Sequence, residues 1–434
     1  MPAPLTLTYR VYAALANLAL SLAYAKVSGR LQTQGVTAAR ARERLGHATL
    51  PRPDGPVIWC HAASVGESVS LLALIAQLLA DDPTLHVLVT SGTASSAQIL
   101  AGRLPVRAIH QFAPLDAMPA LRRFQAHWRP GLAVFVESEI WPQMIVATHA
   151  AGIPLALLNA RMSELSLRNW GRVPGTAAAL FQRFGMIRTQ AVPTAAALIK
   201  LGADAATTRA DGDLKAAAGA LPVDETELSR FRTDLSGRPV WLAASTHPGE
   251  EYKVLQAHKL VTEAAPRTAL ILVPRHPERR QEIAELIRDA GFTMAMRSKV
   301  EPLLPETSVY LADTLGEMGM WYALCPLVFM GGSFVPVGGH NPFEPAQAGA
   351  AILHGPMVAN AASAYRALDE CGGAVEIHDA SATALGYAVQ NLLAGPSKYS
   401  RMSLVEMGLA TRTFAAGQTQ DLPRLAADLR RLMA

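Results

Sequence analysis

One glutamate follows an apolar run at the position where an α/β protein can place a catalytic base. Glu67 lies in HAASVGES, just after the run Val57–Ala62 and before a segment expected to be helical. Ligands of open α/β sheets bind beyond the carboxyl ends of the strands, so a carboxylate in this turn is suited to take a proton. Ser64 and Glu67 also have the spacing of a helix capping box, and both interpretations stay open.

Two further acids lie at the end of a second apolar run. Glu137 lies at the end of the run Leu132–Ser138 and Glu139 directly beyond it, and both precede Trp141 and Pro142. If the extended backbone continues, alternate side chains point to the same side, so both carboxylates would face one ligand. They can then hold a sugar hydroxyl or stabilise reacting groups; the alternative is a pair of solvated loop acids.

Basic residues in two other segments suit an anionic ligand. Arg275 and His276 lie in PRHPERR, directly after the run Thr268–Val273. A guanidinium group there can bind phosphate through two hydrogen bonds. Lys215 lies in DGDLK and can neutralise a sugar carboxylate or a phosphate, although a single lysine is more often a surface charge.

The sequence from MGGSF to GGHNPFEP gives the most specific local signal. Its glycines permit close approach of the backbone to a ligand. Asn341 suits a helix N-cap, Pro342 the first helical position and Glu344 the third. The pattern therefore predicts a helix whose N-terminal amides attract phosphate, with Glu344 able to accept from ribose hydroxyls. The alternative is that Asn341 and Glu344 only cap the helix.

Two shorter polar turns follow apolar runs in the same half of the chain. They are Ser245–Glu251 and Thr314–Met318, and the second contains Leu315, Gly316 and Glu317. Each either lines the ligand or merely starts a helix.

The apolar runs form two series that alternate with helical segments. The first series is Val57–Ala62, Leu85–Ser91, Leu132–Ser138, Ile153–Asn159 and Met186–Thr189; the second is Val240–Ser245, Thr268–Val273, Ser308–Ala312, Leu327–Gly331, Ala351–Leu353 and Ala374–Ile377. Strand and helix in alternation predict parallel sheets with helices on both faces. Uninterrupted apolar runs are typical of such buried strands.

A polar stretch rich in glycine and proline, Asp211–Pro239, separates the two series. It contains a predicted solvated helix at Glu225–Asp234. We place a first domain at 31–215, a junction at 216–238 and a second domain at 239–434, whose last helices can pack back on the first domain. Two such domains place a ligand cleft between them. The missing GxGxxG fingerprint disfavours a dehydrogenase.

Length, charge and cysteine content narrow the class of protein. The 434 residues suit two domains, and a chain that is 50% hydrophobic can bury a large core. A formal net charge of +4 is small for a nucleic-acid-binding protein. The separated cysteines Cys60, Cys325 and Cys371 argue against a zinc site or a disulfide framework and favour a reducing cytosol.

The N-terminal segment combines an uncharged run with many basic residues. Val11–Ala25 carries no charge, and Arg10 and Lys26 bracket it. It is shorter than the roughly 20 residues of a typical spanning helix. We predict a membrane anchor over residues 1–30, with a signal peptide and a buried helix as alternatives. The arginines that follow favour a cytoplasmic body and an anionic surface or acceptor.

Eight motifs together resemble the bacterial Kdo (3-deoxy-D-manno-octulosonic acid) transferases in order and spacing. They are HAASVGE, ESEIWP, NAR, DGDLK, ASTHPGEE, PRHPER, LGEM and GGHNPFEP. This resemblance spans nearly the whole chain. It implies a GT-B fold, in which two Rossmann-like α/β domains face each other across a cleft, with an N-terminal membrane-anchor helix.

The resemblance also implies a reaction. Members of the family transfer Kdo from CMP-Kdo to the 6′-hydroxyl of tetraacylated lipid A precursor, with inversion, at the cytoplasmic face of the inner membrane. No cofactor, metal or nucleic-acid partner is implied, so we interpret Asp211-Gly212-Asp213 as part of the lysine motif. The alternatives are a GT-B enzyme that uses a UDP-sugar and a sugar-nucleotide binding protein without turnover.

Specific residues receive roles from the same resemblance. It implies Glu67 as the general base, and Glu137 and Lys215 as groups that support the transition state. The CMP-binding residues that it implies are Pro274, Arg275, His276, Leu315, Gly316, Glu317, Asn341, Pro342, Phe343 and Glu344. The chain departs from the family pattern at Ala216-Ala217, where relatives often have Phe-Asp, and at Phe343, where leucine is usual. The first departure changes the surroundings expected of Lys215.

Overall fold

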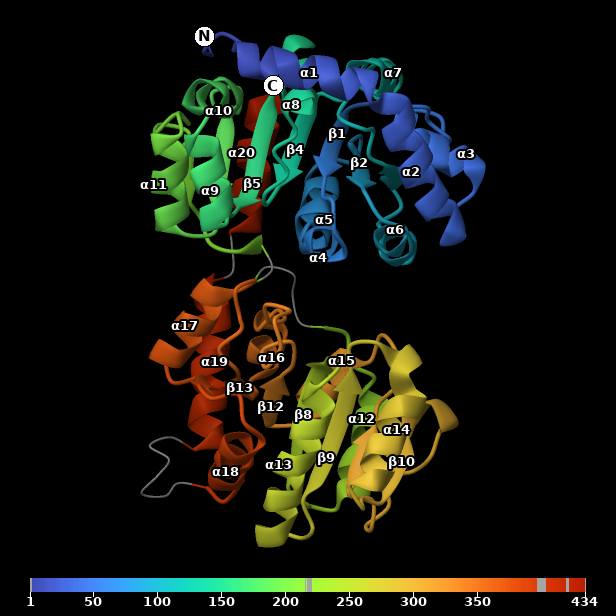
Figure 1. The fold of residues 1–434 in the computed structure, drawn as a ribbon, viewed down its shortest axis with the longest axis vertical. Helices are drawn as coiled ribbons and strands as arrows, with labels where there is room; N and C mark the ends of the chain where they lie inside the picture. Colours follow the sequence, from blue (N-terminus) through green and yellow to red (C-terminus); the bar gives the residue numbers. More distant parts are fainter. Residues whose placement is uncertain (1, 215, 217–220, 396–402, 419–420, 434) are drawn as a thin grey trace. The chain divides into compact units, whose positions relative to one another are not determined.

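The chain folds into two compact units, each built on one parallel sheet (Figure 1). The computed structural model describes residues 2–214, 216, 221–395, 403–418 and 421–433. One unit comprises Met1–Ala218 with Thr419–Ala434, and the other comprises Gly219–Gln418. The prediction of two α/β domains with parallel sheets is confirmed.

The sheet of the first unit has the strand order β3-β2-β1-β4-β5-β6-β7. Its strands are β1 (Val57–His61), β2 (His86–Ser91), β3 (Ala108–Phe112), β4 (Leu132–Val136), β5 (Leu155–Ala160), β6 (Met186–Thr189) and β7 (Thr208–Ala210). The strand order changes direction between β1 and β4. In open α/β sheets, the crevice beyond the carboxyl ends at such a point is where ligands bind.

The sheet of the second unit has the order β10-β11-β9-β8-β12-β13-β14. Its strands are β8 (Val240–Thr246), β9 (Ala269–Pro274), β10 (Met294–Met296), β11 (Val309–Leu311), β12 (Leu327–Met330), β13 (Ala351–His354) and β14 (Ala374–Glu376). Here the change of direction falls between β8 and β12. The loops that follow these two strands therefore meet at the switch point of this unit.

Helices flank the two sheets. In the first unit they are α1 (Leu7–Leu18), α2 (Leu20–Thr33), α3 (Ala38–Ala41), α4 (Val65–Ser70), α5 (Leu72–Asp81), α6 (Ala94–Ala101), α7 (Met118–Trp128), α8 (Pro142–Ala150), α9 (Glu164–Gly171), α10 (Pro174–Phe181), α11 (Val192–Lys200) and α20 (Leu422–Met433). In the second they are α12 (Glu225–Leu235), α13 (Glu250–Ala264), α14 (Arg280–Asp289), α15 (Met318–Leu324), α16 (Phe343–Ala348), α17 (Ala362–Glu370), α18 (Ala382–Leu393) and α19 (Leu404–Gln418). Short 3-10 segments are η1 (Arg42–Leu45), η3 (Pro277–Arg279) and η4 (Arg297–Lys299).

The helix predicted at Glu225–Asp234 exists as α12, but only one of its faces is solvated. Leu228, Phe231 and Leu235 are buried in the core of the second unit. The ring of Phe231 lies 5.0 Å from that of Trp321 and 5.2 Å from that of Tyr310, both edge-on. Much of the stretch predicted as a junction therefore belongs to the packed second unit.

The uncharged N-terminal segment forms two helices rather than one. α1 and α2 meet at Ala19 with a bend of 59°. No single helix within the described residues has the length and hydropathy expected of a membrane span; the bent pair meets that criterion by length and composition together. Figure 1 shows α1 lying across α8, between α10 and α7. Tyr9 is buried in the core of the unit, and the hydroxyls of Thr6 and Thr176 are hydrogen-bonded at 2.6 Å.

Candidate functional site

Glu67 lies at the start of α4, directly beyond β1, and its carboxylate is part of a helix cap. Ser64 is the N-cap, and its Oγ accepts a hydrogen bond from the Glu67 amide at 3.4 Å. The carboxylate reaches back to accept from the Ala63 amide at 2.8 Å and from the Ser64 hydroxyl at 2.9 Å. The predicted capping interaction is therefore present in a modified form, in which Glu67 bonds the amide of Ala63 rather than that of the N-cap residue Ser64. It fixes the carboxylate at the carboxyl edge of the sheet.

The electrostatics of Glu67 favour proton uptake. Burial raises the pKa of this carboxyl above its usual value, and the negative charges of Glu139 and Glu137 raise it further. The hydrogen bonds from Ser64 and Ala63 act in the opposite direction but do not cancel this rise. A carboxylate with a raised pKa is a stronger base, which is the property a general base needs near neutral pH.

Glu137 lies beyond β4 in a backbone conformation that the sequence did not signal. Its φ is +56°, in the left-handed region, so the extended geometry expected of Glu137 and Glu139 does not continue past the strand. The side chain is buried, and its Oε2 accepts from Nε of Arg161 at 2.5 Å. Arg161 belongs to the NAR motif after β5. A non-glycine residue in this conformation is strained and persists only where the surrounding contacts hold it. Such residues cluster at functional sites.

Glu139 connects the ESEIWP loop to the end of β1. Its Oε2 lies 3.3 Å from Nε2 of His61 and accepts from the indole of Trp141 at 2.5 Å. Burial opposes ionisation of Glu139, but the hydrogen bonds and charge of His61, together with the bond from Trp141, outweigh it and hold its pKa below the usual value. The other ring nitrogen of His61 lies 3.0 Å from Oγ1 of Thr90. No role was predicted for His61 from the sequence, although it lies at the end of an apolar run.

Asn159 positions the segment that carries the predicted lysine. It also has a positive φ, +54°, and is fully buried at the end of β5. Its Oδ1 accepts from the Leu214 amide at 2.9 Å. Lys215 itself lies outside the described residues. Asn159 therefore links the NAR and DGDLK motifs through the backbone next to that lysine.

In the second unit, a buried carboxylate organises the glycine-rich loop. Glu250, the first residue of α13, is fully buried and accepts from the amides of Gly332, Ser333 and Phe334 at 2.7, 3.1 and 2.9 Å. It also accepts from the His247 amide at 2.9 Å. Burial raises the pKa of Glu250, and the hydrogen bonds from the amides of Gly332, Phe334 and His247 partly offset the rise. These loop amides serve the fold and are already occupied.

A cluster of histidines lies where the loops after β8 and β12 meet. Nε2 of His247 and Nε2 of His340 are 2.9 Å apart, with their rings stacked at 10°. His276 packs edge-on against His247 at 5.7 Å. Burial, followed by the neighbouring charges of His247, Arg275 and His276, lowers the pKa of His340 to about 4. Burial and the charges of His276 and Arg275 likewise lower the pKa of His247.

The predicted phosphate-binding residues after β9 border this cluster. Pro274 is buried at the end of the strand, and Arg275 and His276 are exposed beyond it. The guanidinium of Arg275 makes no hydrogen bond or ion pair with any residue that the structure describes, whereas Nδ1 of His276 lies 3.3 Å from Glu278. An exposed arginine beside a partly buried histidine pair is suited to bind an anion.

The helix predicted at GGHNPFEP is present, but its cap differs from the prediction. α16 starts at Phe343 with Pro342 in the N-cap position, so the placement of Asn341 at the cap is wrong by one residue. Asn341 still accepts through Oδ1 from the Phe343 amide at 3.1 Å. Phe343 is buried and stacks on Phe414 at 5.6 Å, which accounts for a larger apolar residue here. Glu344 is partly exposed in the first turn.

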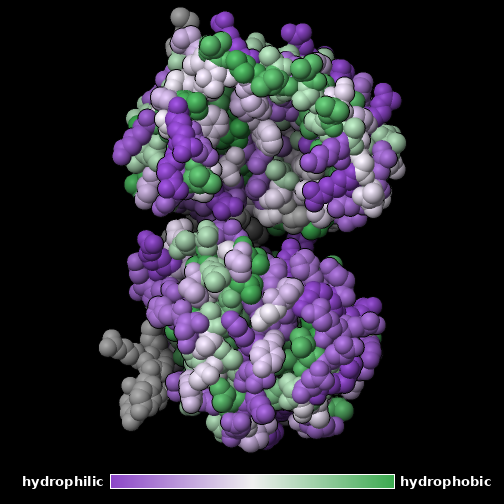
Figure 2. All heavy atoms as spheres, viewed as in Figure 1, coloured by the Kyte–Doolittle hydropathy of each residue, from purple (hydrophilic) through white to green (hydrophobic). Residues whose placement is uncertain are grey.

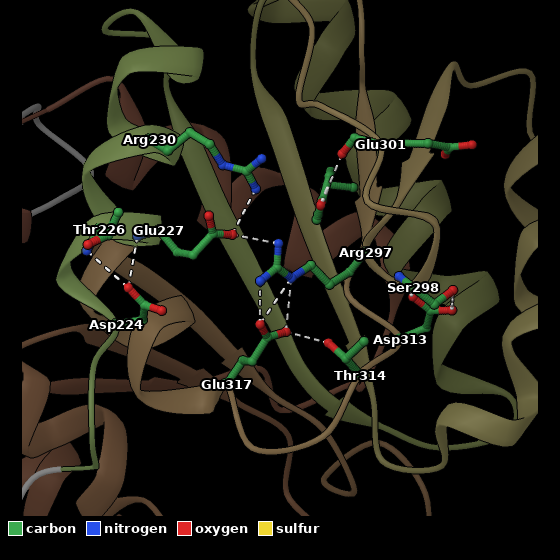
Figure 3. Close-up of polar contacts among 11 residues, drawn as sticks. Asp224, Thr226, Glu227, Arg230, Arg297, Ser298, Glu301, Asp313, Thr314 and Glu317 are labelled. Atoms are coloured by element: carbon green, nitrogen blue, oxygen red, sulfur yellow. Dashed lines mark hydrogen bonds and ion pairs between the residues drawn. The ribbon is translucent and has the colours of Figure 1, made fainter.

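Glu317 of the LGEM motif belongs to an ion-pair network (Figure 3). Arg297 donates to both of its oxygens, at 2.5 to 3.1 Å, and also to Glu227 of α12 at 2.7 Å. Thr314 donates a further hydrogen bond to the same carboxylate. Burial alone would raise the pKa of Glu317, but the bonds from Arg297 and Thr314 lower it. Both oxygens are thereby engaged, while Leu315 and Gly316 remain exposed at the tip of the turn.

Apart from Lys215, which is not described, and the turn with Glu317, which belongs to the ion-pair network of Arg297, the predicted residues form two groups, one at the switch point of each sheet. The first joins Glu67, Glu137 and Glu139 with His61 and Arg161; the second joins Arg275, His276 and the loop before α16 with His247 and His340. Within the described part of the chain, no three His, Cys, Asp or Glu side chains are grouped so that they could hold a metal ion.

Comparison with known proteins identifies relatives of this chain. A family model described as 3-deoxy-D-manno-octulosonic-acid transferase (kdotransferase) matches residues 39–218. The 3-deoxy-D-manno-octulosonic acid transferase of Haemophilus influenzae is 32% identical over 395 residues, which cover 89% of this chain and 91% of the relative. The enzyme of the same name from Bordetella pertussis is 35% identical, over 88% of this chain and 89% of the relative.

Solved structures with little sequence identity to this chain show the same architecture. UDP-GlcNAc 2-epimerase from Neisseria meningitidis, bound to UDP-GlcNAc, matches with a TM-score of 0.58 at 11% identity, over 86% of this chain and 99% of that one. This likeness concerns the fold, which is GT-B-like with two Rossmann-like units. The sequence relatives, matched over most of their length, show that the chain is a glycosyltransferase and belongs to the 3-deoxy-D-manno-octulosonic acid (Kdo) transferase family.

Proposed function

We propose that this protein transfers Kdo from CMP-Kdo to the 6′-hydroxyl of tetraacylated lipid A precursor, with inversion at the anomeric carbon, during lipopolysaccharide synthesis. The observation that carries the proposal is the carboxylate group at the switch point of the first sheet. There, Glu67 is held by its own helix cap and has a raised pKa. The motif pattern and the family membership supply the identity of the transferred sugar.

Glu67 is the general base of the proposed reaction. It takes the proton of the acceptor hydroxyl as that oxygen forms a bond to the anomeric carbon of Kdo. The bond between that carbon and the phosphate oxygen breaks, and CMP leaves with the bonding electrons. The neighbouring charges of Glu139 and Glu137 raise the proton affinity of Glu67 at the moment the proton is transferred.

The second unit binds the leaving nucleotide. Arg275 and the His247–His340 pair face the phosphate, whose negative charge grows as the bond breaks. Burial lowers the pKa of both histidines, and an arriving phosphate favours their protonated form. The exposed turn at Leu315-Gly316 and the first turn of α16 border the nucleoside. Lys215 is proposed to meet the carboxylate of Kdo or the phosphate.

The proposed location is the cytoplasmic face of the inner membrane, with α1 and α2 as the attachment. The support is the row of exposed apolar residues on these helices and the basic residues that follow them. The proposed reaction needs no metal ion. A chelator should therefore leave the rate unchanged, and loss of activity that added Mg²⁺ restores would refute this part.

The direct test supplies the purified protein with a Kdo source, CTP, CMP-Kdo synthetase and tetraacylated lipid A precursor. Mass spectrometry of the lipid should show the gain of one or more Kdo residues. The control omits CTP, without which no CMP-Kdo forms. If the protein is folded and binds CMP but the lipid mass does not change, the acceptor assignment is wrong. If CMP also fails to bind while a UDP-sugar does, the donor assignment is wrong.

A further inference from the structure

An apolar groove lies in the first unit, beside the candidate active site. It has a volume of about 330 Å³ and opens between α1, the ESEIWP loop and the helices α9 and α10. Its walls are mainly aromatic and aliphatic: Thr8, Tyr9, Tyr12, Ile140, Trp141, Pro142, Trp170, Val173 and Thr176. The volume is at the lower end of the range typical of ligand-binding pockets. The catalytic mechanism proposed above gives this groove no role.

One wall of the groove continues into an exposed apolar surface. Successive residues of a helix are about 100° apart, so Leu7, Val11, Leu15 and Leu18 form one row along α1. They are 76%, 50%, 61% and 82% exposed. Thr8 and Tyr12 form the adjacent row, which faces the groove. Figure 2 shows hydrophobic residues, in green, along this end of the unit. An apolar chain can thus pass from the surface of α1 into the groove without crossing a charged row.

The opposite wall of the groove connects with the carboxylate group. Trp141 is 41% exposed, lines the groove and donates its indole N–H to Glu139 at 2.5 Å. Glu139 in turn contacts His61 and contributes to the raised pKa of Glu67. A molecule whose apolar part fills the groove therefore has its polar part next to these carboxylates.

Charged groups of both signs adjoin the groove. Asp116 accepts a hydrogen bond from the hydroxyl of Tyr12 at 2.7 Å, and Glu139 accepts from the indole of Trp141 at 2.5 Å. Arg168 on α9 and Arg172 beyond it are exposed, close in sequence to lining residues, and can meet phosphate groups. The lining itself is apolar and mostly aromatic, so the acyl chain is the part of a glycolipid that fits the groove.

We propose that this groove binds one acyl chain of an anionic glycolipid acceptor and so places the acceptor's sugar hydroxyl at the Glu67 carboxylate. The inference rests on the proposed function and adds a specific acyl-binding site to it. Acyl recognition here gives the enzyme a preference for acceptors with long chains, because each buried methylene changes a binding constant by about fourfold.

The first test fills the groove and measures the dependence on chain length. Val173→Trp places a large ring in the groove, and Val192→Trp makes the same change on the exposed surface of α11 as the control. Precursors with long and short acyl chains are compared in the same detergent. In the wild-type protein and in Val192→Trp, the long chain should lower KM at least tenfold, with similar kcat. In Val173→Trp this advantage should disappear while kcat is retained. An unchanged chain-length dependence in Val173→Trp would overturn the proposal.

A second test does not depend on turnover or on the folding of a variant. The full-length protein is irradiated with a lipid A precursor that carries a photoreactive diazirine in one acyl chain, and the labelled peptides are sequenced. We expect label on the segments that contain Thr8–Tyr12, Trp141 or Trp170. Excess unlabelled precursor should remove this label by competition. If the label that the competitor removes lies elsewhere in the chain, the acyl chain does not bind in the groove. A wild-type protein that is labelled in the groove but transfers no Kdo would instead refute the proposed function alone.

Discussion

A single side chain, Glu67, caps a helix and presents a carboxylate with a raised pKa. Its two roles can be separated because glutamine also completes a capping box, whereas alanine does not. Glu67→Gln should lower kcat by about 10²- to 10⁴-fold with an unchanged melting temperature. Glu67→Ala should lose the same activity and, in addition, about 1 kcal/mol of stability. Steady-state kinetics and thermal melts of both variants decide the point, and a folded, active Glu67→Gln would exclude Glu67 as the base.

The pH dependence of the reaction should report the charge of Glu139. The base works only when Glu67 is ionised, so activity is lost as the pH falls through the raised pKa of that group. Of the neighbouring charges, that of Glu139 raises the pKa of Glu67 most. Glu139→Gln removes this charge and should lower the pKa of Glu67. The acid limb of kcat/KM then moves to lower pH. Glu164→Gln, an exposed acid on α9, is the control. An acid limb that stays in place, or moves to higher pH, contradicts this coupling.

The left-handed backbone conformation of three single residues could not be predicted from the sequence. Glu137, Asn159 and Ser245 all have positive φ at strand ends, and none is a glycine. Nothing in their local sequence indicates this, because tertiary contacts such as the Glu137–Arg161 ion pair maintain it. The residue types and their place at strand ends were predictable, but the contacts that bring His61 and Glu139 together were not.

At the scale of elements, α13 and the glycine-rich loop depend on one buried carboxylate. Glu250→Ala leaves four amides without their acceptor and should destabilise the protein by at least about 3 kcal/mol. CMP affinity should fall with it, since the loop leads to His340 and α16. Denaturant unfolding and calorimetric CMP titration measure the two effects. Glu263→Ala, exposed near the end of the same helix, should stay within about 0.5 kcal/mol of the wild type.

Most of the strands were predictable from sequence, but β3, β7 and β10 were not. The five residues of β4 (Leu132–Val136) are all apolar, and the strand begins where the run Leu132–Ser138 predicts, since a buried parallel strand is an uninterrupted apolar run. β3 contains His110 and Gln111, β7 contains Arg209, and β10 has only three residues, so none gave a recognisable pattern. The polar sequence of α12 suggested a solvated helix. Its buried face was missed because the aromatic residues that pack on Phe231 come about 80 to 90 positions later in the chain.

At the scale of the whole molecule, the sequence correctly indicated the number of domains and their class. Two series of strands with helices between them can form only a few architectures, so the two parallel sheets followed from the pattern. The N-terminal segment was harder to interpret. Its lack of charge suggested one anchor helix, but Tyr9 and Thr6 attach its first part to the body of the unit and the helix bends at Ala19.

That attachment changes how the membrane prediction should be tested. Deleting the segment through Ala25 should weaken membrane binding and spare CMP binding, but it also removes Tyr9 from the core. A sharper variant replaces the exposed Leu7, Leu15, Leu18 and Leu22 by glutamine and leaves Tyr9 in place. Each buried leucine contributes about 1.5–3 kcal/mol, so partition onto anionic vesicles should fall more than 100-fold.

The control for this variant substitutes an apolar residue that is equally exposed but far along the chain from α1. Val192→Gln on α11, 71% exposed in the wild type, should partition as the wild type does. The CMP affinity and melting temperature of the leucine variant should stay close to wild type, because the four leucines contribute no core contacts. Vesicle sedimentation at two salt concentrations separates the apolar contribution from that of the arginines, since only the second weakens with salt. Unchanged partition of the leucine variant at high salt would show that α1 and α2 do not attach the protein to the membrane.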